Sequence, residues 1–220
     1  MIDFLAKECV IVVDVGANKG MWTEYFLNKN SFIQIFLFEP SINAFSVLKT
    51  KFNTTNNVTL INKGLADKKS QNIFFEEPEC GETSSLVPGV SNNHSKQIHV
   101  ELTTVDLIME EYGLTKIDYL KIDVEGYDLF VLKGAEENLK SKKIKFVQFE
   151  YNSSWTMAGS TLIQAFMLFG KYGYKTFLLR WDGLYEFNYA LYGEYYSYSN
   201  FFALPEESVA IIKPLIKGTI

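Results

Sequence analysis

Three acidic residues follow two apolar stretches of strand length, and their carboxylates could handle a proton during a reaction. Asp123 and Glu125 lie at the end of residues 117–124, and Glu150 ends residues 144–150. Alternate residues of a strand point to the same side, so Asp123 and Glu125 should share a face, with Glu150 at the same edge of the sheet. No Lys or Arg occurs in the local letters DVEG and FEYN. Like charges placed in this way either share a proton or bind a cation.

Two chemical roles for these acids are compatible with the sequence. One acid could act as a general base, with its pKa raised by burial and by like-charged neighbours. Alternatively, the three could hold a divalent metal such as Mg²⁺, which prefers oxygen ligands. A purely structural alternative is that Asp123 or Glu125 caps a helix that begins around Gly126. His94, in the polar letters SNNHSK, is a further candidate base because histidine titrates near neutral pH.

The letters DVGANKG form a second candidate site, where the apolar residues 10–15 run into a helix-like pattern. The spacing D-x-G-x-x-x-G predicts a tight turn, but Asn18 and Met21 occupy the second and third glycine positions of a dinucleotide fingerprint. A side chain at Asn18 would crowd a pyrophosphate and Asp14 would repel it, so NAD and FAD fit poorly. A ligand with a cationic or zwitterionic end, such as S-adenosylmethionine, fits better.

Glu39 ends the next apolar stretch, in the letters FLFEPS, 19 residues after Gly20. An acid at the tip of the second strand can accept hydrogen bonds from both ribose hydroxyls and would repel a 2′-phosphate. Pro40 then turns the chain into the following helix. Glu39 and the glycine turn together therefore predict a nucleoside-binding site.

Strand-length apolar runs that alternate with amphipathic stretches must position these residues. The runs are nearly continuous rather than alternating, which is typical of strands buried on both faces of a sheet. Repeated strand–helix–strand units favour a doubly wound, mostly parallel α/β sheet. The expected strands are residues 10–15, 34–38, 58–61, 117–124, 144–150 and 174–179. The expected helices extend to about residue 27 and cover residues 44–52, 129–139 and 162–169.

Two segments depart from this repeat. Residues 71–104 show a hairpin pattern around a loop rich in Gly, Ser, Pro and Asn, and residues 180–204 are crowded with Tyr and Phe. The letters SNFFAL in the second segment would serve as the last strand. Both segments should lie over the carboxyl edge of the sheet, where open α/β sheets bind ligands. We expect one domain, residues 1–220, with a cofactor-binding half at 1–70, an inserted hairpin and loop at 71–104, and a substrate-side half at 105–220.

The overall composition restricts the classes of partner. The chain has 220 residues and a net charge of −5, which argues against nucleic-acid binding as its main function. Cys9 and Cys80 are too few for a disulfide framework, and no signal peptide or apolar run of membrane-spanning length is present. A reduced, cytoplasmic location is the expectation.

The letters DVGANKG, FEPS, TTVD and IDYLKIDVEGYDLFVLKGA resemble those of the FkbM family of S-adenosylmethionine-dependent methyltransferases, over roughly residues 10–150. The resemblance implies a class I methyltransferase fold, which is Rossmann-like, with a seven-stranded sheet whose last strand is antiparallel. It also implies O-methylation of a small-molecule or saccharide acceptor, such as a sugar, a nucleotide-sugar or polysaccharide precursor, or a secondary metabolite. The letters GLAD, which include Ala66 and Asp67, would lie near the adenine. The full set expected to contact the cofactor is Asp14, Gly16, Ala17, Asn18, Gly20, Glu39, Pro40, Ser41, Ala66, Asp67 and Asp123.

Other functions are compatible with parts of the sequence. An N-methyltransferase acting on a macromolecule is one alternative, although DVEG stands where amino-methylating DNA enzymes commonly have Asn-Pro-Pro-Tyr. A catalytically inactive cofactor-binding partner subunit is another. The aromatic residues of the C-terminal third would suit stacking on an acceptor, a plain core or a homodimer surface. These aromatics are Trp155, Trp181, Tyr185, Tyr195 and Tyr196.

Overall fold

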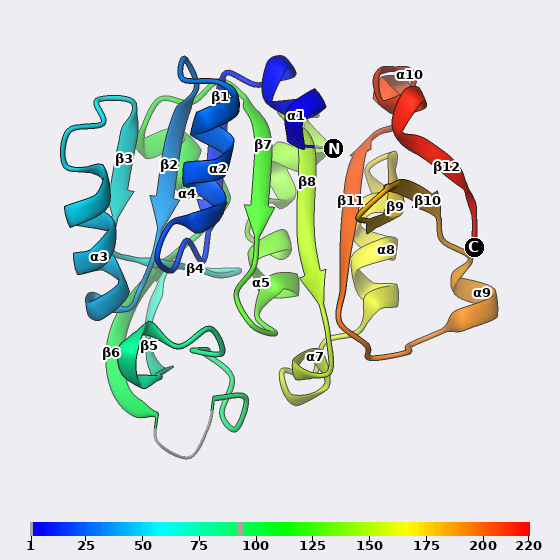
Figure 1. The fold of residues 1–220 in the computed structure, drawn as a ribbon. Coiled ribbons are helices and arrows are strands. Elements are labelled where there is room, and N and C mark those ends of the chain that lie inside the picture. The colour runs from blue at the N-terminus through cyan, green and yellow to red at the C-terminus, as the bar shows by residue number, and fades with distance from the viewer. Residues whose placement is uncertain (1, 92–94) are drawn as a thin grey trace.

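The computed structural model describes residues 2–91 and 95–220, and its main element is a nine-stranded sheet (Figure 1). His94 lies outside the described residues. From one edge to the other, the strands are β12 (Ile216–Thr219), β10 (Gly183–Glu186), β9 (Tyr174–Arg180), β11 (Ser199–Pro205), β8 (Ile144–Tyr151), β7 (Ile117–Ile122), β1 (Ile11–Val15), β2 (Gln34–Phe38) and β3 (Val58–Ile61).

Strand directions confirm the doubly wound arrangement. β1, β2, β3, β7 and β8 pair in parallel, and β11 lies antiparallel between β8 and β9. The letters SNFFAL do form the antiparallel strand, β11. The expected count of seven strands is wrong, because β10 and β12 extend the sheet beyond β9. These two strands are short, and β12 is mostly exposed, so their letters lack the apolar run that marks a buried strand.

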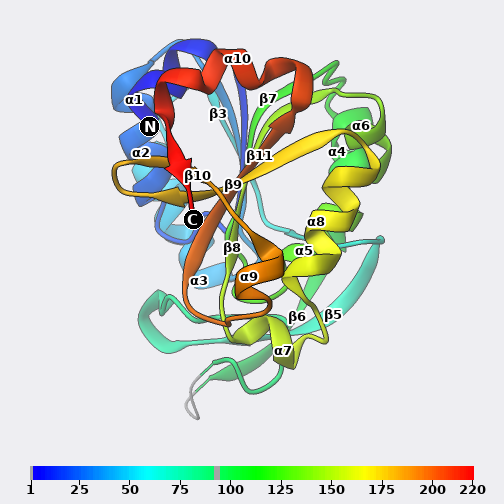
Figure 2. The same cartoon turned by 90° about the vertical axis from the view of Figure 1, so that its right-hand side faces the viewer.

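Helices cover both faces of the sheet, as the edge-on view in Figure 2 shows. One face packs against α1 (Ile2–Leu5), α2 (Met21–Lys29), α3 (Ile42–Phe52) and α10 (Val209–Ile212). The other packs against α4 (Val105–Glu111), α5 (Asp128–Lys133), α6 (Glu136–Lys140) and α8 (Leu162–Lys171). Two short helices, α7 (Ser154–Met157) and α9 (Tyr189–Tyr192), lie in loops. No helix in the described ranges is both long and apolar enough to span a bilayer.

The helix expected at residues 129–139 is two helices, α5 and α6. Gly134 separates them, and a Cβ at this position would lie 2.0 Å from the carbonyl oxygen of Ala66. The glycine therefore allows the helix pair to pack closely against the backbone of Ala66. The break was not predicted, because the apolar pattern continues through residues 129–139.

The predicted hairpin is confirmed and forms a second, smaller sheet. β5 (Ser70–Glu76) pairs antiparallel with β6 (Lys96–Thr103), and β4 (Gly64–Leu65) adds a third strand. This sheet extends past the carboxyl ends of β1, β2 and β7 (Figure 1). Residues 77–91 fold back on it, and the backbones of Phe75 and Ser85 exchange two hydrogen bonds. The insertion thus places a wall beside the edge where the parallel strands end.

Candidate active site

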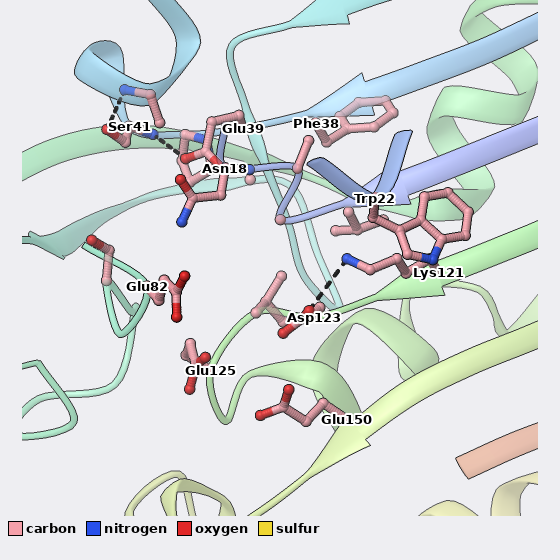
Figure 3. Close-up of a pocket in the computed structure, with 18 of the residues that line it drawn as sticks. Asn18, Trp22, Phe38, Glu39, Ser41, Glu82, Lys121, Asp123, Glu125 and Glu150 are labelled. Carbon is pink, nitrogen blue, oxygen red and sulfur yellow. Dashed lines mark hydrogen bonds and ion pairs between the residues drawn. The ribbon is translucent and has the colours of Figure 1, made fainter. Parts of the chain in front are cut away.

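A pocket of about 450 Å³ lies at the carboxyl edge of the large sheet. Its walls come from the tips of β1, β2, β7 and β8, from the loop of residues 77–91, and from β11. Figure 3 shows the side chains of Asn18, Glu82, Asp123 and Glu125 around a common space. Open α/β sheets bind ligands at this edge because the helix N-termini and loops converge there.

The glycine turn forms the floor of the pocket. Gly16 has φ +78°, and a Cβ on it would lie 1.9 Å from the carbonyl oxygen of Asp123, so only glycine fits between the tips of β1 and β7. The backbone N–H groups of Gly16 and Ala17 donate to the carbonyl of Phe38, which fixes the turn against β2. Gly20, expected to contact the cofactor, does not line the pocket; it is the N-cap of α2, and a Cβ on it would lie 2.6 Å from the ring of Phe52 in α3.

Glu39 lines the pocket with a fixed orientation. One carboxylate oxygen accepts a hydrogen bond from the backbone N–H of Asn18 and the other from that of Ser41, each at 2.8 Å. Only 5% of its surface is exposed, and burial raises its pKa to about 7 despite these two donors. Each oxygen retains a second lone pair, so the carboxylate can still accept two hydroxyl hydrogen bonds.

Asp14 lies behind the pocket rather than in its lining. It is fully buried, accepts a 2.7 Å hydrogen bond from the Thr23 hydroxyl, and lies 3.1 Å from the ammonium of Lys121. The expectation that Asp14 faces the ligand is therefore wrong, because its carboxylate is used by Lys121 and Thr23. Burial alone would lower the pKa of Lys121, but the charges of Asp14 and Asp123 outweigh burial and raise it.

The structure brings Asp123, Glu125 and Glu150 together. One carboxylate oxygen from each lies within 4.8 Å of the other two. Burial, followed by the charge of Asp123, raises the pKa of Glu125 to about 7 and that of Glu150 to about 9. The amide of Asn152 donates to Glu150 at 2.6 Å. At neutral pH this trio can hold a proton, and it can release or accept one as the pH or a ligand changes.

The surroundings of these acids settle two points that the local letters left open. A cation from outside the letters DVEG and FEYN lies beside one of them, because the ammonium of Lys121 is 3.3 Å from Asp123. Lys121 precedes Asp123 by two residues in β7, so strand alternation could have identified it from the sequence. The helix-cap alternative also fails, because α5 has Tyr127 at its N-cap and no side-chain capping bond.

Ala66 and Asp67 do not line the pocket, contrary to the expectation for the letters GLAD. Ala66 directly follows β4 and stays beside β6, because its N–H donates a hydrogen bond to the carbonyl of Thr103. Asp67, the next residue, is exposed. Other residues of this region take their place. Those that line the pocket are Gly64, Leu65, Phe74 and Leu86. They give this end an apolar lining suited to a flat heterocycle.

Several lining residues come from segments that local sequence patterns do not connect. Trp22, Gln148, Tyr198 and Asn200 all border the pocket. The hydroxyl of Tyr119 donates to Gln148, whose amide donates to Asn200, whose amide in turn donates to Tyr198. Two lining residues each have a buried polar atom, Asn18 Oδ1 and Trp22 Nε1, that finds no hydrogen-bond partner in the described ranges. Such atoms are suited to a ligand, since buried polar groups are normally hydrogen-bonded.

A comparison with protein families and curated sequences gives consistent results. The family described as "Methyltransferase FkbM domain" matches residues 14–176. The "Methyltransferase sdnD" of Sordaria araneosa is 28% identical in an alignment 156 residues long, which covers 57% of this chain and 60% of that protein. The "2-O-methyltransferase NoeI" of Sinorhizobium fredii is 24% identical over 180 residues, covering 76% of this chain and 73% of that protein.

Among solved structures, the METTL16 methyltransferase domain has a TM-score of 0.52 at 9% identity. The match covers 93% of this chain and 64% of that chain. A second, the methyltransferase domain of a bacterial Hen1 protein, has a TM-score of 0.50 at 13% identity, covering 93% of this chain and 94% of that chain. At these identities the likeness concerns the fold, which is that of class I methyltransferases.

Proposed function

Since this chain belongs to the methyltransferase FkbM domain family, which is S-adenosylmethionine-dependent, we propose that it methylates a hydroxyl group of a saccharide or another small metabolite. One observation supports this most directly: the acids Asp123, Glu125 and Glu150 line the same pocket as the glycine turn and Glu39. Cofactor-binding chemistry and proton-accepting chemistry thus lie in one cavity. The 2-O-methyltransferase activity in the name of the NoeI relative agrees with a hydroxyl acceptor.

The lining fits S-adenosylmethionine part by part. Glu39 offers two acceptor oxygens for ribose hydroxyls, and the apolar end formed by Leu65, Phe74 and Leu86 suits the adenine. Asn18 Oδ1, buried and not hydrogen-bonded to any residue that the structure describes, is an acceptor for the ammonium of the methionine part. Within the expected set, Ala17, Pro40, Ser41 and Asp123 also line the pocket. NAD and FAD remain poor fits because Asn18 replaces the glycine that a pyrophosphate needs.

Bound S-adenosylmethionine supplies an electrophilic methyl group on a sulfonium. The chain must then hold an acceptor hydroxyl in line and take its proton. Glu125 suits the role of base, because a pKa of about 7 lies close to the working pH that favours general-base catalysis. Lys121 holds Asp123 at the tip of β7, beside the glycine turn. We assign Asp123 to orienting the acceptor and Glu150 to sharing the released proton.

A divalent metal is the alternative role of the trio. Three carboxylates are chemically suited to Mg²⁺, and their oxygens are close enough to share one ion. We favour the metal-free form, because one base suffices for a well-held hydroxyl and Lys121 already offsets part of the negative charge. The two forms are separable: a metal-dependent enzyme loses activity with EDTA and regains it with Mg²⁺ or Mn²⁺.

Two rival functions have less support. Methylation of a macromolecular nitrogen is disfavoured because charged carboxylates, rather than an Asn-Pro-Pro-Tyr segment, follow β7. An inactive partner subunit is disfavoured because three acids with no structural capping role converge in the pocket. A homodimer through the aromatic C-terminal third is still a prediction, as are the division into cofactor and substrate halves and the location.

The test is a transfer assay with methyl-labelled S-adenosylmethionine and a panel of glycosides, phenols and amines, with calorimetric titration of the cofactor alongside. We expect label transfer to a hydroxyl acceptor. Changing Glu125→Gln should lower kcat by roughly 10²–10⁴-fold while cofactor affinity stays within about twofold. Cofactor binding without transfer to any acceptor would identify an inactive module, and transfer to amines alone would identify an N-methyltransferase.

A further inference from the structure

A second cavity, of about 430 Å³, adjoins the first pocket and shares two lining residues with it. Tyr198 and Asn200 line both cavities, so they form the partition between them. The pairing of the strands gives the distance across this partition. Glu150 of β8 pairs with Asn200 of β11, which pairs with Leu179 of β9. Two strand spacings, roughly 10 Å, therefore separate the backbone of Glu150 from that of Leu179 in the far wall, and Arg180 follows Leu179 at the end of β9.

The second cavity offers aromatic surface. Tyr192 and Tyr198 line it and are 48% and 72% exposed. Protein contacts fix two rings of the cavity: Tyr192 stacks on Phe187, and the hydroxyl of Tyr195 donates a hydrogen bond to that of Ser199. Trp155, by contrast, is fully buried in the core and cannot contact a ligand. Rings held in place with an open face are suited to the apolar face of a sugar.

The charge of the cavity is distinctive. Arg180 lines it and is the single arginine among the 220 residues. Its guanidinium lies 5.3 Å from the ring centre of Tyr185, and in the part of the chain that the structure describes it forms no ion pair. No Asp or Glu side chain is among the described residues that line the cavity. A guanidinium without a carboxylate partner is suited to binding a carboxylate or a phosphate.

We infer that this second cavity is an acceptor subsite for an anionic saccharide unit, whose carboxylate or phosphate binds Arg180 while the hydroxyl to be methylated lies at the acid trio. This inference rests on the proposed function. Arg180 would attract an anionic group of the ligand, whereas the carboxylates of Asp123, Glu125 and Glu150 would repel one. A saccharide that carries its charge one ring away from the reacting hydroxyl would therefore bind in a single orientation.

Binding of small probes tests the subsite without requiring turnover. The protein, saturated with S-adenosylhomocysteine, is titrated with methyl β-glucoside, methyl β-glucuronide and glucose 1-phosphate, and binding is followed by backbone amide NMR shifts. We expect the charged probes to bind roughly tenfold or more tightly than the neutral one, as one charge-assisted hydrogen bond provides. The glucuronide and phosphate arms show which anion Arg180 prefers.

Two substitutions of Arg180, one that removes its charge and one that keeps it, assign the effect to this residue. Arg180→Gln should abolish the preference for charged probes, and Arg180→Lys should restore part of it. Lys213→Gln, which removes one exposed charge from outside the lining, should leave the preference unchanged. Equal affinity for all probes, no detectable binding of any probe, or a preference that survives Arg180→Gln would overturn the subsite. Charge-selective binding without methyl transfer to any hydroxyl would leave the subsite intact and reject the proposed function.

Discussion

At the scale of single residues, Glu39 shows how backbone geometry prepares a side chain for a ligand. Its two oxygens already accept hydrogen bonds from the N–H groups of Asn18 and Ser41. A glutamine at this position could satisfy only one of these donors, because its amide nitrogen would face the other. The carboxylate is therefore needed both for the turn and for the ribose contact that we propose.

We expect Glu39→Gln to weaken S-adenosylmethionine binding by roughly 1.5–3 kcal/mol, the value of a hydrogen bond to a charged group. Because burial raises the pKa of Glu39 to about 7, wild-type affinity should also increase from pH 6 to pH 8 as the carboxylate ionises. Isothermal titration at both pH values measures the two effects. Glu111→Gln, on the exposed end of α4, is the control. Unchanged affinity in Glu39→Gln would refute the ribose assignment.

Lys121 connects the stability of the fold to the site. Its side chain is 7% exposed and that of its partner Asp14 is fully buried. Removing the lysine leaves a buried carboxylate without its cation, which typically costs about 3–5 kcal/mol.

We therefore expect Lys121→Met to lower the free energy of unfolding by about that amount in urea titrations. Lys51→Met removes a more exposed pair with Glu24 and should cost at most about 1 kcal/mol. Adding Asp14→Asn to Lys121→Met should recover part of the loss. If Lys121→Met and Lys51→Met cost the same, the buried pair has no special role.

At the scale of elements, the turn after β1 can form because the tips of β1, β2 and β7 meet with no side chain between them. Gly16 lies against the carbonyl of Asp123, at the tip of β7, and bonds to Phe38, at the end of β2. The pocket floor therefore depends on the absence of a Cβ as well as on a positive φ.

Two alanine variants separate these requirements. Gly16 and Gly113 both have positive φ, but a Cβ on Gly113 meets no atom within 4 Å. We expect Gly113→Ala to cost about 1–2 kcal/mol, the strain of the left-handed backbone alone. Gly16→Ala should cost clearly more and should abolish cofactor binding, measured by thermal unfolding and titration. Equal losses of stability with cofactor binding retained would show that the contact with β7 is unimportant.

The insertion between β3 and β7 affects the site through one buried serine. The hydroxyl of Ser85 donates to the carbonyl of Glu125 at 2.7 Å and accepts the N–H of Val87. This contact joins the loop of residues 77–91 to the turn that carries Glu125, whose backbone has φ +51°. The insertion therefore supports the orientation of the acid that we propose as the base.

At the scale of the whole molecule, carboxyl groups whose pKa is raised gather in the pocket and, with Asp128, directly behind it. Burial is the main cause that raises the pKa values of Glu39 and Glu125 to about 7, Asp128 to about 8 and Glu150 to about 9. The folded chain thus binds protons more tightly at these groups than the unfolded chain, whose carboxyls titrate near pH 4. The stabilisation of the folded state by these groups is complete below about pH 4. It is lost as the pH rises through the pKa values that the groups have in the folded protein.

We expect the ligand-free protein to unfold at a lower temperature at pH 8.5 than at pH 5.5. Glu150→Gln should reduce this difference, whereas the exposed control Glu111→Gln should leave it at the wild-type value. Calorimetric scans at the two pH values provide the measurement. A stability that increases with pH over this range would show that the acids are ionised at little cost, for example because a cation occupies the trio.

The sequence by itself determined the parallel core and the main anchor points of the site. Apolar runs marked β2 and β3 at their observed bounds, and the positions of Glu39, Asp123 and Glu150 at strand tips follow from where those runs end. These features are local, since strand period and glycine spacing are set by neighbouring residues.

Only the tertiary structure decided which of these residues face the ligand. Asp14 and Lys121 come together because β1 and β7 are neighbours in the sheet, and this pairing removes Asp14 from the pocket. Asp67 turns away because β4 pairs with β6. Tyr198 and Asn200 line the pocket because β11 pairs with β8, and Arg180 lies one strand further away, at the end of β9. Such contacts join residues far apart in the chain, and their geometry depends on strand order, which no local pattern encodes.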